Sequence, residues 1–519
     1  MDRAVLGVEQ RDRPRWVEEP TVSMFNRTRG TSILASVSSG VLAASMAAAA
    51  VVGSSSAALA TSPSAYAQAS WYDKYLTVSS DVVPLCTGNT GSVPQPDFGA
   101  NVDASHECGS QSETSIAINP ANARNVIAGA NEIQRLPMRA MYSTDGGPTF
   151  TGVDLPLPPA RTNKGFDFGS DPGLAFDSSG NAFYSYIVVF FGAGGGINGT
   201  AMAVARSGDG GATWTATYFN PQTGSGQFDD KPMITVDTGS GTGHHHNRIY
   251  VAWDHATGSS SSTKNGNNIL LSSSDDGGAT FSTPVSVSGQ FTGKTGGIGA
   301  DPYIASNGTV HVAWQDYAHG TIVDAGSTDG GTSFSAPHLI ATVGGFAFNV
   351  AAQSSRGALV YPACGSYANT LYCSYMDGSS ASTTVYVATS TNGGTTWTST
   401  AMPAGGDQFN QWLAVDASDG SVNVAYYDTG THGASPTTYT LARSIDGGST
   451  WTKTAVATAT TDETCCTPSV NLGNQYGDYE GLAAFGGVVR PVWTDRRADV
   501  IALGLREEVF VAAITPPGP

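Results

Sequence analysis

The sequence predicts an all-β fold, a β-propeller of seven blades, with six blades as the alternative count. Three observations predict it: the composition, a turn motif present in six copies, and a longer strand pattern present in seven. Of the 519 residues, 64 are Gly and only 13% are charged. Many turns separating short apolar runs indicate short strands, and so few charges exclude a coiled coil or a charge-rich disordered protein.

The turn motif reads Ser-x-Asp-x-Gly-x-Thr-aromatic. Its six copies are Ser143–Phe150, Ser207–Trp214, Ser274–Phe281, Ser327–Phe334, Ser390–Trp397 and Ser444–Trp451, with Asn392 in place of Asp in the fifth. A short Asp or Asn side chain accepts hydrogen bonds from nearby backbone N–H groups, and Gly supplies positive φ, so each copy predicts a hairpin turn. We therefore expect these acidic residues to be structural.

This motif resembles the Asp box, or BNR repeat, of sialidase-like β-propellers, and the resemblance covers most of residues 110–515. It implies blades of four antiparallel strands around a central channel, with each Asp box between strands three and four on one face of the ring. The starts of the first strands and the ends of the second strands would share the opposite face. The resemblance also implies a glycan-acting enzyme, a glycoside hydrolase of sialidase-like type.

A second pattern lies upstream of the Asp boxes: an acidic residue, an apolar strand, a turn, and a strand ending in an aromatic residue. Residues 301–316 show it most plainly, and a seventh copy, residues 477–497, follows the last Asp box. Residues 111–519 are therefore expected to form the propeller, whose last blade lacks a strand. Within the N-terminal segment, residues 70–110, the run around Tyr75 and Val82–Val83 is the candidate to supply that strand, closing the ring and removing exposed sheet edges.

Residues 1–69 have the features of an overextended start followed by a signal peptide. Arg27 and Arg29 precede an Ala-rich apolar run, and Ala67-Gln68-Ala69 fits a cleavage site before Ser70. A transmembrane anchor is less favoured because the run exits through small residues with no basic flank. We expect the mature chain to be secreted, to the extracellular space or the periplasm.

The chain carries a formal net charge of −18, which argues against nucleic acid and anionic membranes as partners, since both need a basic footprint. Six cysteines in an exported chain favour disulfides; the simplest local pairs are Cys86–Cys108 and Cys364–Cys373, with the adjacent Cys465–Cys466 left open. We expect no metal or cofactor because there is no CxxC spacing for zinc and no Asp-x-Asp-x-Asp-Gly loop for Ca²⁺. Exposed Asp clusters keep Ca²⁺ open as an alternative.

The face shared by the strand-one starts and strand-two ends would gather many carboxylates. Crowding raises the pKa of one carboxyl group while another stays ionised, and two separated carboxyl groups are what glycosidic hydrolysis commonly needs. The candidate catalytic residues are Asp478, Tyr479, Glu480, Asp230 and Asp301. The candidate substrate-binding residues are Arg496, Arg497, Asp171, Asp254, His255, Asp316 and Tyr317, although for Asp254 and Asp316, which recur from blade to blade, a structural role is favoured.

Segments 477–480 and 495–497 break the repeat and bring an acid, a phenol and two guanidinium groups together. An arginine there could clamp a carboxylate or sulfate on a sugar. Tyr479 beside Glu480 is similar to the sialidase Tyr/Glu nucleophile pair, but adjacent residues on a strand point to opposite faces. The chain lacks the early Phe-Arg-Ile-Pro-like motif and the three carboxylate-binding arginines of sialidases, so exo-sialidase activity itself is not expected.

Three function classes stay open: a glycoside hydrolase, a polysaccharide lyase with Tyr or His as base, and a non-catalytic propeller that binds glycan or protein. A carbohydrate or glycoconjugate is the expected partner, and the chain is expected to be a monomer. The discriminating observation is whether perturbed carboxyl groups converge on an open pocket or whether the channel mouth is plugged.

Overall fold

The computed structural model describes residues 70–79, 99–159, 167–191, 197–222, 224, 227–257, 267–289, 296–378, 382–464, 474–498 and 507–515. All the described residues belong to one compact unit, Thr61–Pro519. None of the helices in these ranges is long and apolar enough to span a membrane.

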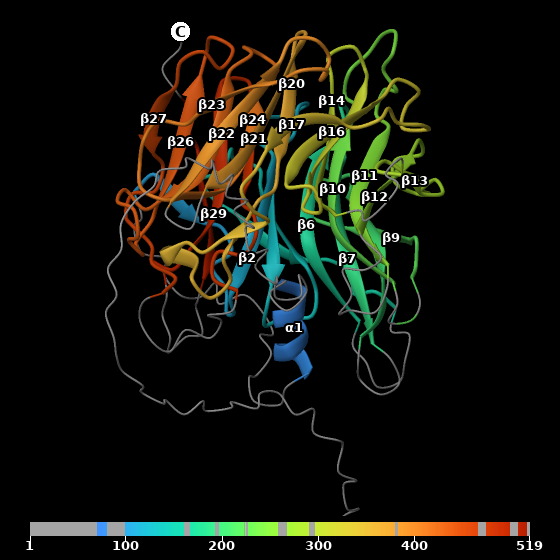
Figure 1. Ribbon diagram of the computed structural model, residues 1–519. Helices are drawn as coiled ribbons and strands as arrows, with labels where there is room; N and C mark the ends of the chain where they lie inside the picture. Colours follow the sequence, from blue (N-terminus) through green and yellow to red (C-terminus); the bar gives the residue numbers. More distant parts are fainter. Residues whose placement is uncertain are drawn as a thin grey trace, which may run out of the picture. The chain divides into compact units, whose positions relative to one another are not determined.

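Seven four-stranded antiparallel sheets, the blades, form this unit (Figure 1). Blade 1 contains β2 (Gln111–Ile118), β3 (Val126–Glu132), β4 (Arg139–Ser143) and β5 (Thr151–Asp154). Blade 2 contains β6 (Phe168–Phe176), β7 (Ala182–Phe191), β8 (Ile197–Ser207) and β9 (Thr215–Phe219). Blade 3 contains β10 (Gln227–Val236), β11 (Ile249–Thr257), β12 (Asn267–Ser274) and β13 (Val285–Ser286). Blade 4 contains β14 (Gly297–Ile304), β15 (Val310–Asp316), β16 (Thr321–Ser327) and β17 (His338–Thr342). Blade 5 contains β20 (Ala363–Tyr367), β21 (Thr370–Gly378), β22 (Thr383–Ser390) and β23 (Thr398–Ala401). Blade 6 contains β24 (Gln408–Val415), β25 (Val422–Asp428), β26 (Thr438–Ser444) and β27 (Thr452–Ala455). A small hairpin, β18 (Ala347–Phe348) and β19 (Ala358–Leu359) with the 3-10 helix η1 (Ala351–Gln353), lies between blades 4 and 5.

Blade 7 joins the two ends of the propeller. It contains β28 (Gly481–Phe485), β29 (Val488–Asp495), β30 (Glu508–Ala512) and, as its outermost strand, β1 (Asn101–Asp103). β1 pairs antiparallel with β30, from Asn101 opposite Ala512 to Asp103 opposite Phe510. The prediction of an all-β propeller with seven blades is confirmed.

The strand expected around Tyr75 is instead a helix, α1 (Ser70–Ser79), and Val82–Val83 lie outside the described residues. The buried side chains Trp71, Lys74 and Val78 recur at helical spacing, and Asp73 lies in the first turn, where a negative charge favours the helix. The expectation of a strand is wrong because the buried residues of this run follow the period of a helix, although the run also contains β-branched residues.

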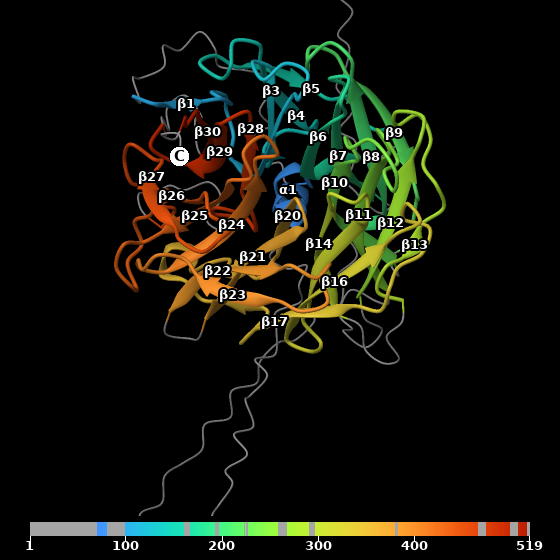
Figure 2. The same cartoon turned by 90° about the horizontal axis from the view of Figure 1, so that it is seen from above.

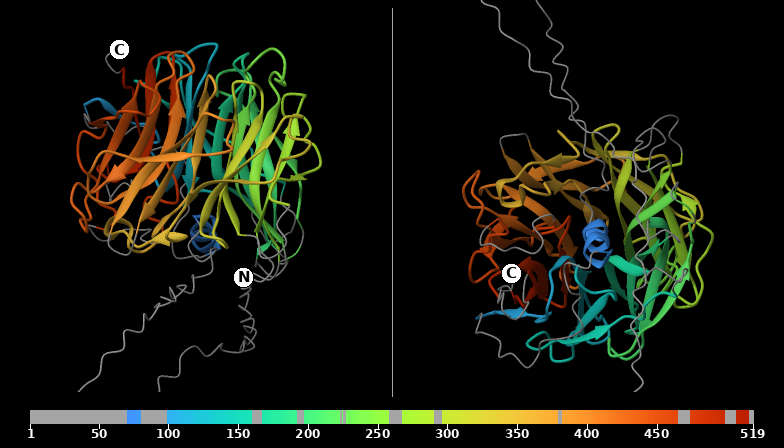
Figure 3. Two further views of the ribbon diagram at one scale, coloured as in Figure 1. Left: turned by 45° about the horizontal axis from the view of Figure 1, so that its top comes forward. Right: turned by 90° about the horizontal axis from the view of Figure 1, so that it is seen from below.

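α1 lies at one end of the ring (Figure 1) and at its centre when the molecule is seen from above or below (Figures 2 and 3). It contacts β3 and β6. We call this end, where the first strand of each blade begins, the hub face.

The Asp boxes close turns at the opposite end, the Asp-box face, because the Ser that begins each one pairs with the start of the second strand, as Ser143 pairs with Val126. In the first turn, Ser143 Oγ and Thr149 Oγ1 donate to Asp145 over 2.8 and 2.7 Å. The hydrogen bonds from Thr149 lower the pKa of Asp145 to about 2. The carboxylate is thus occupied in holding its own turn.

One disulfide follows the expected local pairing. Cys364 and Cys373 lie opposite each other on β20 and β21 and are joined by a 2.02 Å S–S bond. Cys108 is also disulfide-bonded, whereas Cys86 and the Cys465–Cys466 pair lie outside the described residues.

Candidate active site

Five first strands carry the same irregularity at the hub face. The register between the first and second strands shifts in β2, β6, β10, β14 and β24. One residue at each shift has positive φ: Glu113 (54°), Asp171 (60°), Lys231 (52°), Gly299 (66°) and Asn410 (48°). Bulges re-aim side chains, and positive φ at a non-glycine residue is a strain typical of functional sites.

The bulges bring distant charges together at the channel centre. We call this group the hub cluster: Glu113, Asp171, Asp230, Lys231, Arg356 and Asp478, all between 0 and 3% exposed. The Lys231 ammonium lies 2.6 Å from Asp478 Oδ2, and Arg356 Nε lies 2.7 Å from Asp478 Oδ1. Arg356 Nη2 also lies 2.9 Å from Glu113 Oε1.

Asp478 is held ionised within the cluster by its two cationic neighbours. Burial alone would raise the pKa of Asp478, but the Arg356 guanidinium and the Lys231 ammonium hold it below its usual range. Burial would likewise lower the pKa of Lys231, but Asp478 and Glu113 hold it well above its ordinary value. The ammonium also lies 5.4 and 5.5 Å from the ring centres of Tyr361 and Tyr479, within cation–π range.

Asp171 and Asp230 form a hydrogen-bonded carboxyl pair with opposite pKa shifts. Burial and the charge of Asp171 hold the pKa of Asp230 well above its usual range. Burial opposes ionisation of Asp171 too, but Lys231 and hydrogen bonds from Asp230 and Asn131 hold its pKa below the ordinary value. Asn131 Nδ2 donates to Asp171 Oδ1 over 3.0 Å. Asp230 therefore keeps a proton that Asp171 has lost.

The helix α1 covers this cluster. The Trp71 indole packs at a tilt against the Phe228 ring, with ring centres 4.5 Å apart, and its Nε1 donates to Asp230 Oδ2 over 3.3 Å. Lys74 Nζ donates to Gly169 O over 2.8 Å, and Ser70 Oγ donates to Asn474 Oδ1 over 2.6 Å. Perturbed carboxyl groups thus converge at the hub face, and its mouth is plugged.

The structure places four of the predicted residues around Lys231: Asp171, Asp230, Asp478 and Tyr479. A fifth, Asp254, lies directly across the sheet from Asp230, and burial raises its pKa well above the usual range. The Tyr479 hydroxyl donates to Pro172 O over 3.4 Å.

Glu480 and Asp301 lie apart from the hub cluster and connect neighbouring blades. Glu480 Oε1 accepts from the Tyr427 hydroxyl over 2.5 Å, and its other oxygen accepts from Thr114. Asp301 Oδ2 accepts from the Cys364 amide over 2.6 Å. Burial raises the pKa of both Glu480 and Asp301 to about 7. Tyr479 and Glu480 do point to opposite sides, so they do not form a sialidase-like pair.

Arg496 and Arg497 lie at the end of β29, away from the hub cluster. Arg497 Nη2 lies 2.6 Å from Asp495 Oδ2, and Arg497 Nη1 donates to Asn101 in β1 over 3.1 Å. Arg496 Nε lies 3.9 Å from Glu463. The guanidinium groups of both arginines therefore lie against acceptors in blade 7 or in the segment beside it.

The remaining predicted residues make local contacts. His255 Nδ1 lies 2.5 Å from Asp229 Oδ1, and Asp316 Oδ2 lies 2.6 Å from His319 Nδ1. Tyr317 packs edge-on against Phe346 with ring centres 5.4 Å apart, and burial raises its pKa to about 12. Across the ranges that the structure describes, no three His, Cys, Asp or Glu side chains are grouped to hold a metal ion.

Sequence reasoning missed Arg356, Asn131 and the α1 side chains. Arg356 lies between η1 and β19, outside the strand pattern of the blades, so the repeat gave no reason to place it at the centre. The signal for it in the sequence is that it is a cation outside the strand repeat, in the insertion between blades 4 and 5.

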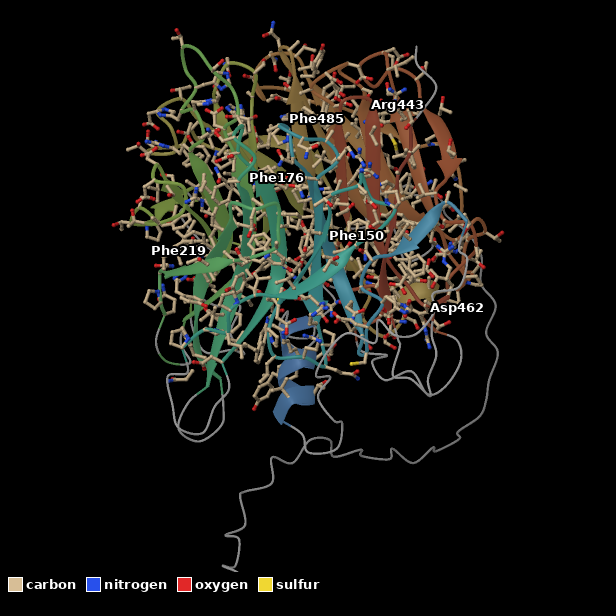
Figure 4. The ribbon with its side chains drawn as sticks, turned by 180° about the vertical axis from the view of Figure 1, so that it is seen from behind. Phe150, Phe176, Phe219, Arg443, Asp462 and Phe485 are labelled. Atoms are coloured by element: carbon tan, nitrogen blue, oxygen red, sulfur yellow. A yellow bond between two sulfur atoms is a disulfide. The ribbon has the colours of Figure 1, made fainter. Side chains whose placement is uncertain are left out.

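A cavity of about 670 Å³ fills the channel beyond the hub cluster. Apolar side chains from the later parts of the first strands line it, including Ile116, Leu174 and Ile234, together with Phe176 and Phe485, which are labelled in Figure 4. Asp237 and Asp301 are the acidic residues among its lining. The hub cluster thus lies at the hub face, whereas Asp301 lies beside this wider space.

No family model and no curated protein matches the chain. Among solved structures, it is similar to a Hadza microbial sialidase (14% identity over 76% of this chain and 74% of that one, TM-score 0.41). It is also similar to the α-L-arabinanase of Penicillium chrysogenum complexed with arabinobiose (11%, 81% and 98%, TM-score 0.44) and to a leech intramolecular trans-sialidase (13%, 63% and 66%, TM-score 0.40).

Proposed function

We propose that the chain is an exported glycoside hydrolase in which Asp230 is the general acid, Asp478 is the ionised partner, and α1 covers the site until it is displaced. The observation that carries this proposal is the pair of opposite pKa shifts beside one ammonium, that of Lys231. A protonated and an ionised carboxyl group at one centre are the groups that glycosidic cleavage commonly uses.

In this mechanism Asp230 protonates the leaving glycosidic oxygen, and Asp171 keeps the proton on Asp230 by its negative charge. Asp478, held ionised by Arg356 and Lys231, acts on the anomeric carbon directly or through a water. The anomer of the first product, read by NMR, tells these two routes apart because a direct attack retains configuration and a water-mediated attack inverts it.

A second candidate is favoured by the plugged mouth: a non-catalytic propeller whose hub cluster only holds the blades together. The deciding experiment uses protein exported from the full-length gene, incubated with a panel of neutral and acidic polysaccharides while new reducing ends are measured. We expect turnover on at least one glycan and a higher rate for Trp71→Ala, which removes the ring contact with Phe228. The matched control is Leu76→Ala, because Leu76 is 46% exposed on the same helix. Absence of turnover from all three proteins would reject the hydrolase.

The proposed export signal has its own test. N-terminal sequencing of the exported protein should begin Ser70-Trp71-Tyr72, which leaves α1 in the mature chain. A mature chain that begins beyond Ser79 would lack the cover, and then Trp71→Ala would have no meaning for activity.

Docking of α1 should be weakest between about pH 6 and pH 7. Burial lowers the pKa of Lys74 to about 7; the charged groups near it are Glu132, Arg135, Asp171 and Asp154. Burial raises the pKa of Asp73 to about 6; the charged groups near it are Arg356 and Asp478. The docked helix therefore holds fewer protons than the free helix above pH 7, so docking strengthens as the pH rises from there. It holds more protons below pH 6, so docking also strengthens as the pH falls. Hydrogen exchange of the α1 amides, corrected for intrinsic rates, should show least protection in that window; a monotonic pH profile would contradict this.

A further inference from the structure

Blade 4 contains a buried Asp–His pair between its second and third strands, which no other Asp-box blade has among the described residues. Asp324 Oδ2 lies 2.8 Å from His311 Nδ1, and Asp324 Oδ1 accepts from the Tyr303 hydroxyl over 3.0 Å. The Tyr303 ring stacks on the His311 ring with centres 5.1 Å apart. Asp324 is 1% exposed and His311 is 4% exposed. The imidazole is thus fixed in orientation by a carboxylate and by an aromatic face.

The repeat shows how unusual this carboxylate is. Asp324 stands three residues before the Ser that begins its Asp box, on the third strand of the blade. The same position in the other Asp-box blades holds Ala140, Val204, Leu271, Val387 and Leu441, all buried. Replacing a buried ion pair by apolar residues of similar volume is often neutral or stabilising. Blade stability therefore gives no reason for Asp324.

The pair uses only one nitrogen of the imidazole. Asp324 accepts from Nδ1, and within the described ranges the hydrogen bonds made by His311 include none to Nε2. An imidazole whose Nδ1–H is held by a carboxylate presents Nε2 to a ligand, as an acceptor when neutral and as a donor when protonated.

A cavity of about 470 Å³ lies against His311, between blades 4 and 5. This volume falls in the range of small-molecule sites, about 300–1,000 Å³. Besides Asp324 and the two imidazoles of His311 and His338, its polar side chains are hydroxyls and amides, among them Ser306, Thr328, Asn369 and Asn392. The lining contains no Lys, Arg or Glu.

A second departure from the repeat lies in the same wall. Asn392 occupies the position that is Asp in the other five Asp boxes, and its Nδ2 donates to Thr396 Oγ1 over 2.8 Å. The amide preserves the turn while it removes a negative charge from the cavity wall. Uncharged donors and acceptors around an imidazole match the hydroxyl groups of a neutral sugar.

We propose that His311, Asp324 and Asn392 form a binding site for one uncharged sugar residue, on the Asp-box face between blades 4 and 5. The sugar hydroxyls bind the amides, the hydroxyl side chains and Nε2 of His311. This site does not depend on the hub cluster being catalytic, because it lies on the opposite face of the ring and shares no residue with it.

The test is NMR of the full protein with ¹³C-labelled histidine, titrated with the methyl glycosides of glucose, galactose, mannose and arabinose and with a neutral oligosaccharide. We expect at least one probe to shift the His311 Cε1–H signal while the signal of His432, an exposed residue outside this cavity, stays in place. A shift with the oligosaccharide alone would assign the site to a residue within a glycan chain, and a shift with a methyl glycoside would assign it to a terminal or free sugar. Glucosamine and glucuronate should bind more weakly than the neutral probe.

The variant that isolates the site is the double substitution His311→Tyr and Asp324→Leu, which copies the Tyr250 and Leu271 pair of blade 3. Since blade 3 packs with this pair, the variant should fold, with a Tm lowered at most by the loss of the hydrogen bond from the Tyr303 hydroxyl to Asp324. We expect it to lose roughly tenfold or more in affinity, measured by ligand-observed NMR, which corresponds to about 1.4 kcal/mol. The proposal is overturned if no neutral probe shifts the His311 signal, if the charged sugars bind better, or if the double variant binds as well as the natural chain.

Discussion

Asp230→Asn should lower kcat/KM by about 10² to 10⁴-fold, the usual contribution of a general acid, while the protein stays folded. Burial and the charge of Asp171 keep Asp230 protonated, so Asn replaces one neutral donor by another of the same shape. Its amide can still donate to Asp171. The substitution removes the transferable proton and little else.

The control for this variant is Asp446→Asn, which removes a carboxyl group from the Asp box of blade 6 at the other face of the ring. Its activity should be unchanged. The pH profile gives a second check, because a general acid must be protonated, and activity therefore falls as the pH rises through its pKa. That fall should occur well above the pKa of 3.8 of an ordinary Asp; a fall near 3.8, or full activity in Asp230→Asn, would remove Asp230 from the mechanism.

Lys231→Met should lower the free energy of unfolding by about 3–5 kcal/mol, the effect of removing one partner of a buried ion pair. Lys231 is 2% exposed, and its ammonium lies 2.6 Å from Asp478 Oδ2 and 3.9 Å from Glu113 Oε1. Met keeps the length of the side chain but leaves Asp478 with Arg356 as its remaining cation and removes the charge from between two tyrosine rings. Equilibrium unfolding in guanidinium chloride measures the change from the shift of the midpoint.

Lys453→Met is the matched comparison because Lys453 also pairs with an aspartate, Asp428, and its side chain is 27% exposed. We expect a smaller change there, because the Lys453 side chain is partly exposed to solvent whereas the Lys231 side chain is buried. If both variants lose the same free energy of unfolding, the buried Lys231 pair contributes no more to stability than the partly exposed Lys453 pair.

The blade count could be predicted from the sequence because the Asp box is a local device. Its Ser, Asp, Gly and Thr hydrogen-bond to one another within eight residues, as in Ser143–Phe150. A short stretch of sequence therefore contains every residue that the turn needs. The position of each first strand in the repeat likewise placed Asp171, Asp230 and Asp478 at one face, since the alternation of strand directions carries the same position in each blade to the same end of the ring.

Contacts between unlike segments could not be predicted in this way. Arg356 reaches Glu113 and Asp478 from the insertion between blades 4 and 5, and α1 reaches the hub cluster from outside the repeat. The positive φ of Glu113, Asp171 and Lys231 also has no signal in a pattern that treats the first strands as regular. Asp324 is different: aligning the residues three positions before each Asp box would have shown one carboxylate among five apolar residues.

The pairing of β1 with β30 has a consequence for how this protein is made. A chain that leaves the ribosome or the export channel in order presents Asn101–Asp103 early, yet their partners, Glu508–Ala512, emerge last. The earliest strand must therefore wait without its sheet while six blades assemble, and such long-range pairing slows folding. Any nascent chain cut short before residue 508 would keep an open rim, so a stalled or truncated product should be recognisable by its tendency to self-associate.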